Sequence, residues 1–171
     1  MSTSSERVEY PALNEGVESM PSKERAARMV EVNLGYAQCF MDGDFEGMLD
    51  YLIDVPVFEH YPMGIRITGR AAVLERSRRL HPSAVQNDSR TAGDTHVITA
   101  STAGSDVLIH EFNNVFDLPD GTRTRCYMLA VVPFVGDKMV GENVYTDHRV
   151  ADWWDSLFGE DYLEIPGVEL L

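Results

Sequence analysis

The amino-acid sequence predicts an α+β domain in which helices come first and a curved, mainly antiparallel sheet follows. The first half of the chain carries apolar residues at helical spacing, interrupted by one short strand-like run. The second half alternates apolar and polar residues in four segments divided by turn signals. Helices followed by a run of antiparallel strands are typical of the α+β class.

Two amphipathic helices are expected at the start of the domain. Ser22 can cap the first helix, and Gly43 can end it. Asp44 can then cap a second, short helix over residues 45 to about 52. The apolar face of the first helix is formed by residues spaced three and four apart, namely Met29, Val32, Tyr36, Cys39 and Phe40.

A strand and a third helix follow. The apolar run that leads into Glu59-His60-Tyr61 predicts a strand over residues 56–61. Thr68-Gly69-Arg70 opens the third helix, and we expect this helix to end at His81-Pro82, because proline is unfavourable inside a helix. We interpret three arginines as its solvated face: Arg76, Arg78 and Arg79.

The sheet is predicted from four segments that are rich in β-branched and aromatic residues. Short connections such as Pro119-Asp120-Gly121 and Gly136-Asp137 indicate hairpins, so the strands should form an antiparallel meander. A curved sheet over a long helix leaves a concave interior, which is a natural small-molecule pocket. The segments are 94–101, 105–118, 122–135 and 138–150.

The chain of 171 residues is long enough for one domain with a substantial core. We expect a flexible N-terminal arm over residues 1–20, one α+β domain over 21–159 and an acidic C-terminal tail over 160–171. The helix "ADWWDSLFG" closes the domain, and Trp153 and Trp154 either plug the wide end of the sheet or form a dimer contact.

Composition excludes several classes of function. A net charge of -14 opposes sequence-independent nucleic-acid binding and binding to anionic membranes. Cys39 and Cys126 form neither a disulfide framework nor a zinc motif, and no phosphate loop is present, so no metal or cofactor is expected. The N-terminal sequence has no secretory signal, and no apolar run approaches the ~18 residues that span a bilayer. These features predict a cytoplasmic location.

The order of the elements, with "YAQCFMDGD" on the first helix and "GRAAV" opening the third, resembles the nuclear transport factor two-like superfamily. Its branches include SnoaL-like polyketide cyclases, ketosteroid isomerases, limonene epoxide hydrolases and scytalone dehydratases. The resemblance covers roughly residues 24 to 158. It implies a cone-shaped α+β barrel, a small-molecule pocket and a homodimer formed through the exposed face of the sheet.

The ketosteroid isomerase pattern can be placed on this sequence residue by residue. Its helix tyrosine, seven residues before a Gly-Asp pair, corresponds to Tyr36. Its catalytic carboxylate, sixteen residues after that Asp, corresponds to His60, with Glu59 beside it. Its protonated acid, which donates to the oxyanion, falls near Ala130. The resemblance therefore implies a base opposite a phenol, with the third group of the family lost.

Other branches of the superfamily point to further residues. The scytalone dehydratase pattern implies a pocket histidine at His110. The epoxide hydrolase set of two aspartates and an arginine has no match, since Glu111 and Asn113 are the nearest residues and the arginine is absent. The cyclase pattern "E-x-x-Y-x-D" on the closing strand matches well, and Asp147 is one candidate for the acidic general base that this branch implies. The residues of that match are Glu142, Tyr145 and Asp147.

Each candidate also has a structural interpretation. His60 can exchange a proton near neutral pH, or it can be a histidine at a strand end that hydrogen-bonds to backbone. Alternation along the strand places Glu59 on the opposite face. Tyr36 can bind a ligand, or it can belong to the core with its hydroxyl bonded at the edge. Asp147 can act as a base, or it can cap the last helix and pair with Arg149.

The strand over residues 105–117 has two faces, and its phase does not decide which one lines the pocket. Asn113-Asn114 in the middle of this strand is unusual, because asparagine is depleted in strands. One of the two should face a polar group such as a ligand. We favour the face that carries His110, Phe112 and Asn114.

These observations predict a SnoaL-like enzyme that performs cofactor-independent acid/base chemistry on a hydrophobic, carbonyl-bearing substrate. Isomerisation, cyclisation and dehydration all use the same groups: His60 as the base, Tyr36 as the donor, and His110 or Asp147 in support. The alternative is a non-catalytic protein of the same fold that binds a hydrophobic ligand. A protein-interaction module would need an exposed apolar patch instead. The expected substrate contacts are Phe58, Phe112, Asn114 and Tyr145.

Overall fold

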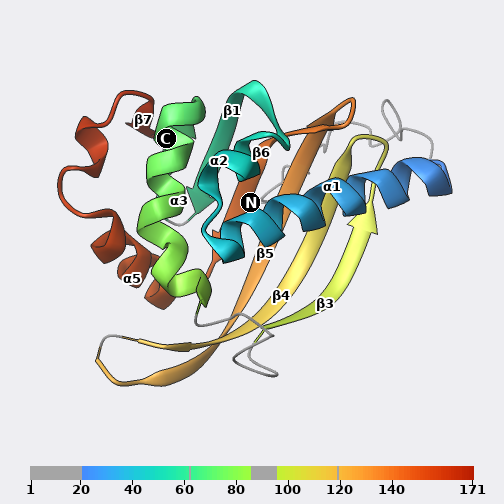
Figure 1. Cartoon of the computed structure of the whole chain (residues 1–171). Helices are drawn as coiled ribbons and strands as arrows, with labels where there is room; N and C mark the ends of the chain where they lie inside the picture. The colour runs from blue at the N-terminus through green and yellow to red at the C-terminus, as the bar shows by residue number, and fades with distance from the viewer. Residues whose placement is uncertain (1–20, 62, 86–95, 119) are drawn as a thin grey trace, which may run out of the picture.

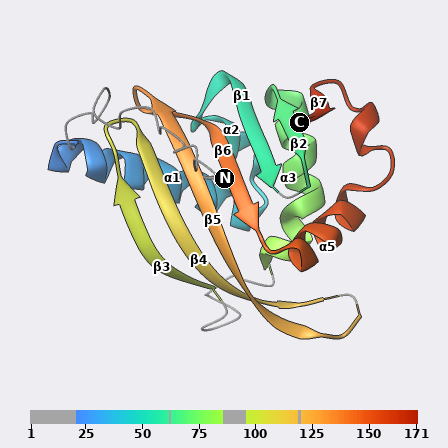
Figure 2. The same ribbon diagram turned by 180° about the vertical axis from the view of Figure 1, so that it is seen from behind.

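A mixed seven-stranded sheet carries the helices α1, α2 and α3 on one face in this computed structural model of the chain (Figures 1 and 2). The structure describes residues 21–61, 63–85, 96–118 and 120–171. The α+β class predicted from the sequence is confirmed. The arm expected at residues 1–20 and Pro119 of the predicted connection Pro119-Asp120-Gly121 lie outside the described residues.

The strands follow the order β3-β4-β5-β6-β1-β2-β7, so β3 and β7 are the edges of an open sheet. The predicted antiparallel meander is confirmed, because β3, β4, β5 and β6 pair in sequence with antiparallel neighbours. One pair, β1 with β6, is parallel, which makes the sheet mixed. The strands are β1 (Leu52–Tyr61), β2 (Ile65–Thr68), β3 (His96–Ala103), β4 (Val107–Asp117), β5 (Arg123–Val135), β6 (Lys138–Thr146) and β7 (Val168–Leu170).

The first two helices have the caps that the sequence predicts. Helix α1 spans Lys23–Asp42, and its N-cap Ser22 accepts a hydrogen bond from the backbone N–H of Arg25 at 3.1 Å. Gly43 ends α1 in the left-handed conformation, with φ of 75°. Asp44 accepts from the N–H of Gly47 and caps α2, which spans Phe45–Leu49.

The third helix is longer than expected. Helix α3 spans Arg70–Val85 and contains Pro82, so the prediction that it ends at His81-Pro82 is wrong. Contacts on both sides of the proline hold this last turn, because the Ser83 hydroxyl donates to the Leu80 carbonyl and the His81 ring packs edge-on against Phe45. Tertiary packing here outweighs the local cost of proline.

The C-terminal segments close the domain. Helix α5 spans His148–Phe158, with both tryptophans buried: Trp153 packs against Phe116, and the ring of Trp154 lies 5.6 Å from that of His60. The segment 160–171, which was expected to be an acidic tail, contains the short helix η1 (Tyr162–Glu164) and strand β7, which pairs with β2.

Helix α1 crosses the concave face of the strands β4, β5 and β6, and α3 lies beside it (Figure 1). Apolar side chains fill most of the space between these layers, including Met29, Met48, Phe58, Leu108 and Val132. A cavity remains between α1, α3 and the strands, and this is where the candidate site lies. Among the described residues, no helix combines the length and the hydropathy that a membrane crossing requires.

Candidate functional site

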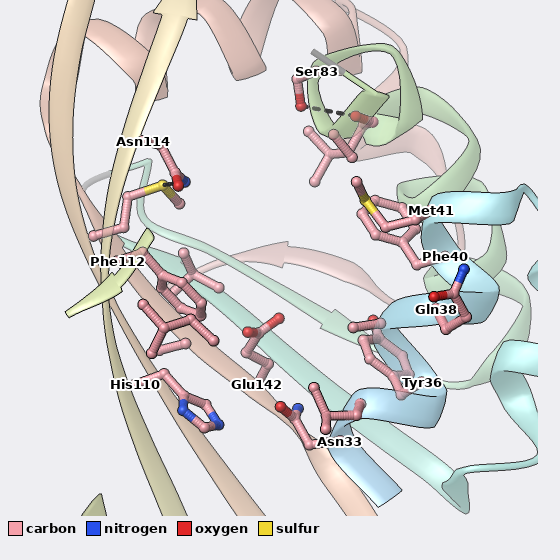
Figure 3. Close-up of a pocket in the computed structure, with 18 of the residues that line it drawn as sticks. Asn33, Tyr36, Gln38, Phe40, Met41, Ser83, His110, Phe112, Asn114 and Glu142 are labelled. Atoms are coloured by element: carbon pink, nitrogen blue, oxygen red, sulfur yellow. Dashed lines mark hydrogen bonds between the residues drawn. The ribbon is translucent and has the colours of Figure 1, made fainter. Parts of the chain in front are cut away.

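A cavity of about 370 Å³ lies between α1, α3, α5 and the inner face of β3 to β6. Its wall is mainly apolar, with a small number of polar side chains that converge on the interior (Figure 3). This composition is typical of small-molecule sites. The polar wall residues with which the chemistry is argued are Tyr36, Arg76, His110, Asn114 and Glu142.

Arg76 is the buried cation of the site, with 4% of its surface exposed. Its guanidinium lies over the ring of Phe58, 4.4 Å from the centroid, and its Nε donates a hydrogen bond of 2.7 Å to Nε2 of His60. The interpretation of Arg76 as part of a solvated helix face is therefore wrong. Arg76 shares the buried side of α3 with Val73 and Leu80, at spacings of three and four residues.

Glu142 provides the opposite charge. This residue comes from β6, and its carboxylate Oε2 lies 3.7 Å from Nη2 of Arg76. Burial raises the pKa of Glu142, while the nearby Arg76 cation acts in the opposite direction. Arg76 and Glu142 are the two formally charged side chains among the described residues that line the cavity. Figure 3 shows the Glu142 carboxylate directed into the cavity space toward Tyr36.

Tyr36 lies on the buried face of α1, and its ring stacks on Phe58 at 6.2 Å between centroids. Its hydroxyl is buried and has no hydrogen-bond partner among the described residues. Burial raises the pKa of Tyr36 to about 12, although the Arg76 cation opposes this change. The phenol is therefore neutral near pH 7 and can donate a hydrogen bond to a ligand in the cavity.

His60 does not line this cavity. Alternation along β1 turns its side chain inward, as predicted, and turns Glu59 to the other face, where Glu59 pairs with Arg66. The imidazole is 1% exposed, and its Nε2 accepts from Arg76. Burial, together with the Arg76 cation, lowers the pKa of His60 well below its usual value. The structure therefore places Arg76, rather than His60, on the same cavity wall as Tyr36.

Three further candidates also lie away from the cavity. Asp147 caps α5 by accepting from the N–H of Arg149, and the hydrogen bond to the Arg149 side chain lowers the pKa of Asp147 to about 2. Tyr145 lies on the outer face of the sheet, where its ring stacks on Tyr61 at 4.7 Å. Phe58 packs beneath Arg76 and Tyr36 without reaching the cavity wall.

The remaining candidates line the cavity from β4. His110, Phe112 and Asn114 face it at every second position, on the side of the strand that the sequence analysis favoured. The Nδ1 of His110 lies 2.8 Å from the hydroxyl of Ser101, and burial lowers the pKa of His110. Tyr36, His110, Phe112 and Asn114 are thus the predicted residues that the structure brings together.

Sequence reasoning did not select Arg76 or Glu142 for the site, although signals for both were present. Arg76 interrupts the apolar spacing Val73-Arg76-Leu80 on α3, a position where a charged side chain must be buried and paired. Glu142 belongs to the cyclase-like pattern, in which Asp147 was the candidate base. Within the described ranges, no group of three or more His, Cys, Asp or Glu side chains is arranged to hold a metal ion.

No protein-family model and no curated protein sequence matches the chain. Solved structures do match its fold. An NTF2-like protein from Burkholderia pseudomallei K96243 is 13% identical, with a TM-score of 0.57 over 74% of this chain and 96% of that one. A putative SnoaL-like polyketide cyclase from Shewanella denitrificans OS-217 is 10% identical, with a TM-score of 0.53 over 75% and 97% of the two chains.

A third structure, TerC co-crystallised with polyporic acid, is 15% identical, with a TM-score of 0.54 over 74% of this chain and 98% of that one. At such identities the likeness concerns the fold, and function has to be argued from the site. The element order, the helices on one face of the sheet and these neighbours agree with the resemblance found in the sequence. The chain therefore has the NTF2-like fold.

Proposed function

We propose that the protein is a small-molecule enzyme that performs cofactor-independent acid/base chemistry on a hydrophobic substrate with a carbonyl group. Glu142 acts as the general base, Tyr36 as the hydrogen-bond donor and Arg76 as the cation that stabilises negative charge. The observation that carries this proposal is the buried Glu142 carboxylate, 3.7 Å from Arg76, in one apolar cavity with the unpartnered hydroxyl of Tyr36. TerC, a structural neighbour that was co-crystallised with polyporic acid, adds general support for a small-molecule ligand.

The arrangement suits proton abstraction next to a carbonyl. The substrate carbonyl accepts a hydrogen bond from Tyr36, and the Glu142 carboxylate removes a proton from the adjacent carbon. The electron pair of that C–H bond moves to the carbonyl oxygen, where Tyr36 and Arg76 stabilise the enolate. In an isomerisation the substrate carries a β,γ C=C bond, so the enolate is conjugated with it, and Glu142 returns its proton to the γ-carbon as the double bond moves to the α,β position. In a dehydration, the enolate expels a β-hydroxyl group, which takes the proton from Glu142 and leaves as water.

His60 contributes through Arg76. Its Nε2 can accept the Arg76 Nε–H only while the ring is unprotonated at that nitrogen, and the lowered pKa of His60 keeps it so. This hydrogen bond and the Phe58 ring hold the guanidinium in place. We therefore assign His60 a positioning role in place of the base that the ketosteroid isomerase pattern implies.

The test is hydrogen–deuterium exchange of 2-tetralone, a neutral ketone with acidic C–H bonds, followed by NMR in D₂O. The unsubstituted protein should accelerate exchange at the carbon next to the carbonyl. Glu142→Gln removes the base and should lower the rate at least about 100-fold. Tyr36→Phe removes one oxyanion donor and should lower it by a similar factor.

Glu111→Gln, an exposed glutamate on the outer face of the same sheet, is the matched control and should leave exchange unchanged. Exchange that survives Glu142→Gln at the full rate would remove Glu142 as the base. Binding of 2-tetralone without any acceleration of exchange would favour the alternative function, a non-catalytic protein that binds a hydrophobic ligand.

A further inference from the structure

Three more buried polar atoms of cavity-wall residues have no hydrogen-bond partner among the described residues: Nε2 of His110 and Oδ1 of Asn114 on β4, and Nε1 of Trp154 on α5. The side chains of His110 and Asn114 are more than nine-tenths buried, at 5% and 6% exposed. Leaving a buried polar atom without a partner costs about 1–3 kcal/mol, so such atoms in a cavity wall indicate where a ligand bonds. Nε2 of His110 and Oδ1 of Asn114 both belong to β4, whereas the Tyr36 hydroxyl belongs to α1.

The orientation of the Asn114 amide defines what it can bind. Its Nδ2 lies 3.2 Å from the sulfur of Met128 and donates to it. A thioether sulfur accepts hydrogen bonds and cannot donate them, so the amide nitrogen belongs on that side, and Oδ1, which has no partner among the described residues, is left to bind a ligand. A carbonyl-type oxygen can only accept. The complementary group on a ligand is therefore a hydroxyl or an N–H.

Strand register separates Asn114 from the proposed catalytic end of the cavity. Asn114 and His110 are four residues apart on β4, or roughly 13 Å at ~3.3 Å per residue. The ladder continues from His110 to Ala130 on β5 and then to Val144 on β6, two residues beyond Glu142. Glu142 and Asn114 thus lie to opposite sides of the His110 level. Phe112 lies between His110 and Asn114, and Figure 3 shows Asn114 and Tyr36 on separate parts of the wall.

The charge of the wall is balanced. Arg76 and Glu142 carry opposite charges 3.7 Å apart, and the other described residues of the wall are uncharged or, for His110, have a pKa lowered by burial. An anionic ligand would be repelled by Glu142, and a cationic ligand would be repelled by Arg76. A neutral ligand leaves this pair intact.

We propose that the ligand is a neutral, elongated and mainly apolar molecule with hydrogen-bonding groups at both ends. One end is a carbonyl group, which Tyr36 and Arg76 bind beside Glu142. The other end carries a hydroxyl or N–H that donates to Oδ1 of Asn114. The assignment of the carbonyl end rests on the proposed function, whereas the donor end and the neutrality rest on Asn114 and on the charge balance of the wall.

The proposal is tested with a matched set of biphenyl ketones, whose binding is measured by calorimetry at pH 7. 4-Acetyl-4′-hydroxybiphenyl carries a ketone and a hydroxyl at opposite ends. Its parent, 4-acetylbiphenyl, lacks the hydroxyl, and 4-acetyl-4′-methoxybiphenyl replaces the donor by an acceptor. The hydroxy compound should bind roughly 3- to 10-fold more tightly than either, because it alone satisfies Asn114.

Asn114→Leu should abolish this preference, while Asn113→Leu, which changes the neighbouring side chain on the opposite face of β4, should retain it. The ligand comparison on the unsubstituted protein stands even if Asn114→Leu fails to fold. Equal binding of the three compounds, no measurable binding of the hydroxy compound, or a preference that survives Asn114→Leu would overturn the assignment of Asn114.

Charge is tested with 4′-acetylbiphenyl-4-carboxylate. This anion should bind at least about 10-fold more weakly than the methoxy compound, which also lacks a donor, and Glu142→Gln, which leaves Arg76 without its carboxylate, should reduce that difference. If the anion binds the unsubstituted protein more tightly than the uncharged compounds do, the proposal that the ligand is neutral is overturned. Calorimetry needs no turnover. If the protein prefers the hydroxy compound but does not accelerate 2-tetralone exchange, the catalytic proposal is refuted while the assignment of Asn114 stands.

Discussion

The guanidinium of Arg76 contacts His60, Phe58 and Glu142 at the same time. A buried cation is costly unless its donors are bonded and its charge is compensated. His60 provides an acceptor, Phe58 provides a π face, and Glu142 provides the charge. The Arg76 cation helps to lower the pKa of His60 and opposes the rise in the pKa of Glu142, so the proposed base cannot be considered without Arg76.

Removing Arg76 should change the acid/base behaviour of Glu142. In Arg76→Leu the carboxylate loses its nearby cation while burial remains, so its pKa should rise further. A base works in its deprotonated form, so the exchange rate of 2-tetralone rises with pH through this pKa. That rise should move to higher pH by roughly one unit or more. Arg78→Leu, at an exposed position of the same helix, is the control, and an unchanged profile in Arg76→Leu would contradict the proposed coupling.

His60 should make the stability of the protein sensitive to acid. Its pKa is lowered in the folded state by burial and by Arg76, so the unfolded chain takes up a proton near pH 6.5 before the native protein does. The free energy of unfolding should therefore be highest above about pH 6.5 and should decrease as the pH falls. The contribution of one such histidine is about 1.4 kcal/mol per pH unit at most.

Urea unfolding between pH 5 and 8 measures this effect. His60→Gln keeps an acceptor for Arg76 and removes the titrating group, so the decrease on acidification should become smaller. His148→Gln, at an exposed position, controls for the loss of one histidine. A decrease of the same size in His60→Gln and in the unsubstituted protein would rule out His60 as its source.

At the scale of elements, the parallel pairing of β1 with β6 positions Glu142. Gly141 precedes Glu142 on β6, pairs with Val57 on β1 and has a φ of 155°. A Cβ at this position would collide with the backbone carbonyl of Val57, which is not free to move away. The close approach of the two strands therefore requires glycine here.

Gly141→Ala should destabilise the protein by roughly 3 kcal/mol or more, because β1 and β6 must separate or bend. It should also slow 2-tetralone exchange, since Glu142 would shift with its strand. Gly136, in the β5–β6 hairpin, has a φ of 56° and open space where a Cβ would be added. Gly136→Ala should therefore lower the free energy of unfolding by only about 1–2 kcal/mol. Urea unfolding of the two variants checks the difference, and equal losses would contradict the role of strand contact.

At the scale of the whole molecule, we propose that the protein is a homodimer formed through the outer face of the sheet. No helix of the described residues covers this face (Figure 2), which carries Tyr127 and Tyr145, 69% and 42% exposed, beside Leu129 and Val131. An apolar surface on an otherwise acidic chain is a typical site of association, and twofold pairs are the commonest assembly.

Light scattering coupled to size-exclusion chromatography should give twice the mass of one chain. Tyr127→Glu should shift the protein toward the monomer, because it places a charge in the centre of the proposed contact. Val30→Glu, at an exposed apolar position of α1, which packs on the opposite face of the sheet, is the control and should leave the mass unchanged. A monomeric mass for the unsubstituted protein would refute the dimer.

The sequence by itself determined the local features of this protein. Alternation and helical spacing identified the meander and the buried face of α1, and the side chains of Ser22 and Asp44 marked helix starts, because capping depends on neighbours along the chain. Strand alternation also turned His60 inward and Glu59 outward. These properties require no knowledge of distant segments.

Only the tertiary structure decided which inward side chains meet. It extended α3 through Pro82 by packing against α1 and α2, and it added the C-terminal segment to the sheet edge through β7. It also placed Arg76 between His60 and the cavity, which gave Glu142 its charge partner and left His60 without access. Contacts between α3, β1 and β6 bring together residues far apart in the sequence, and the cost of burying an unpaired charge selects this arrangement.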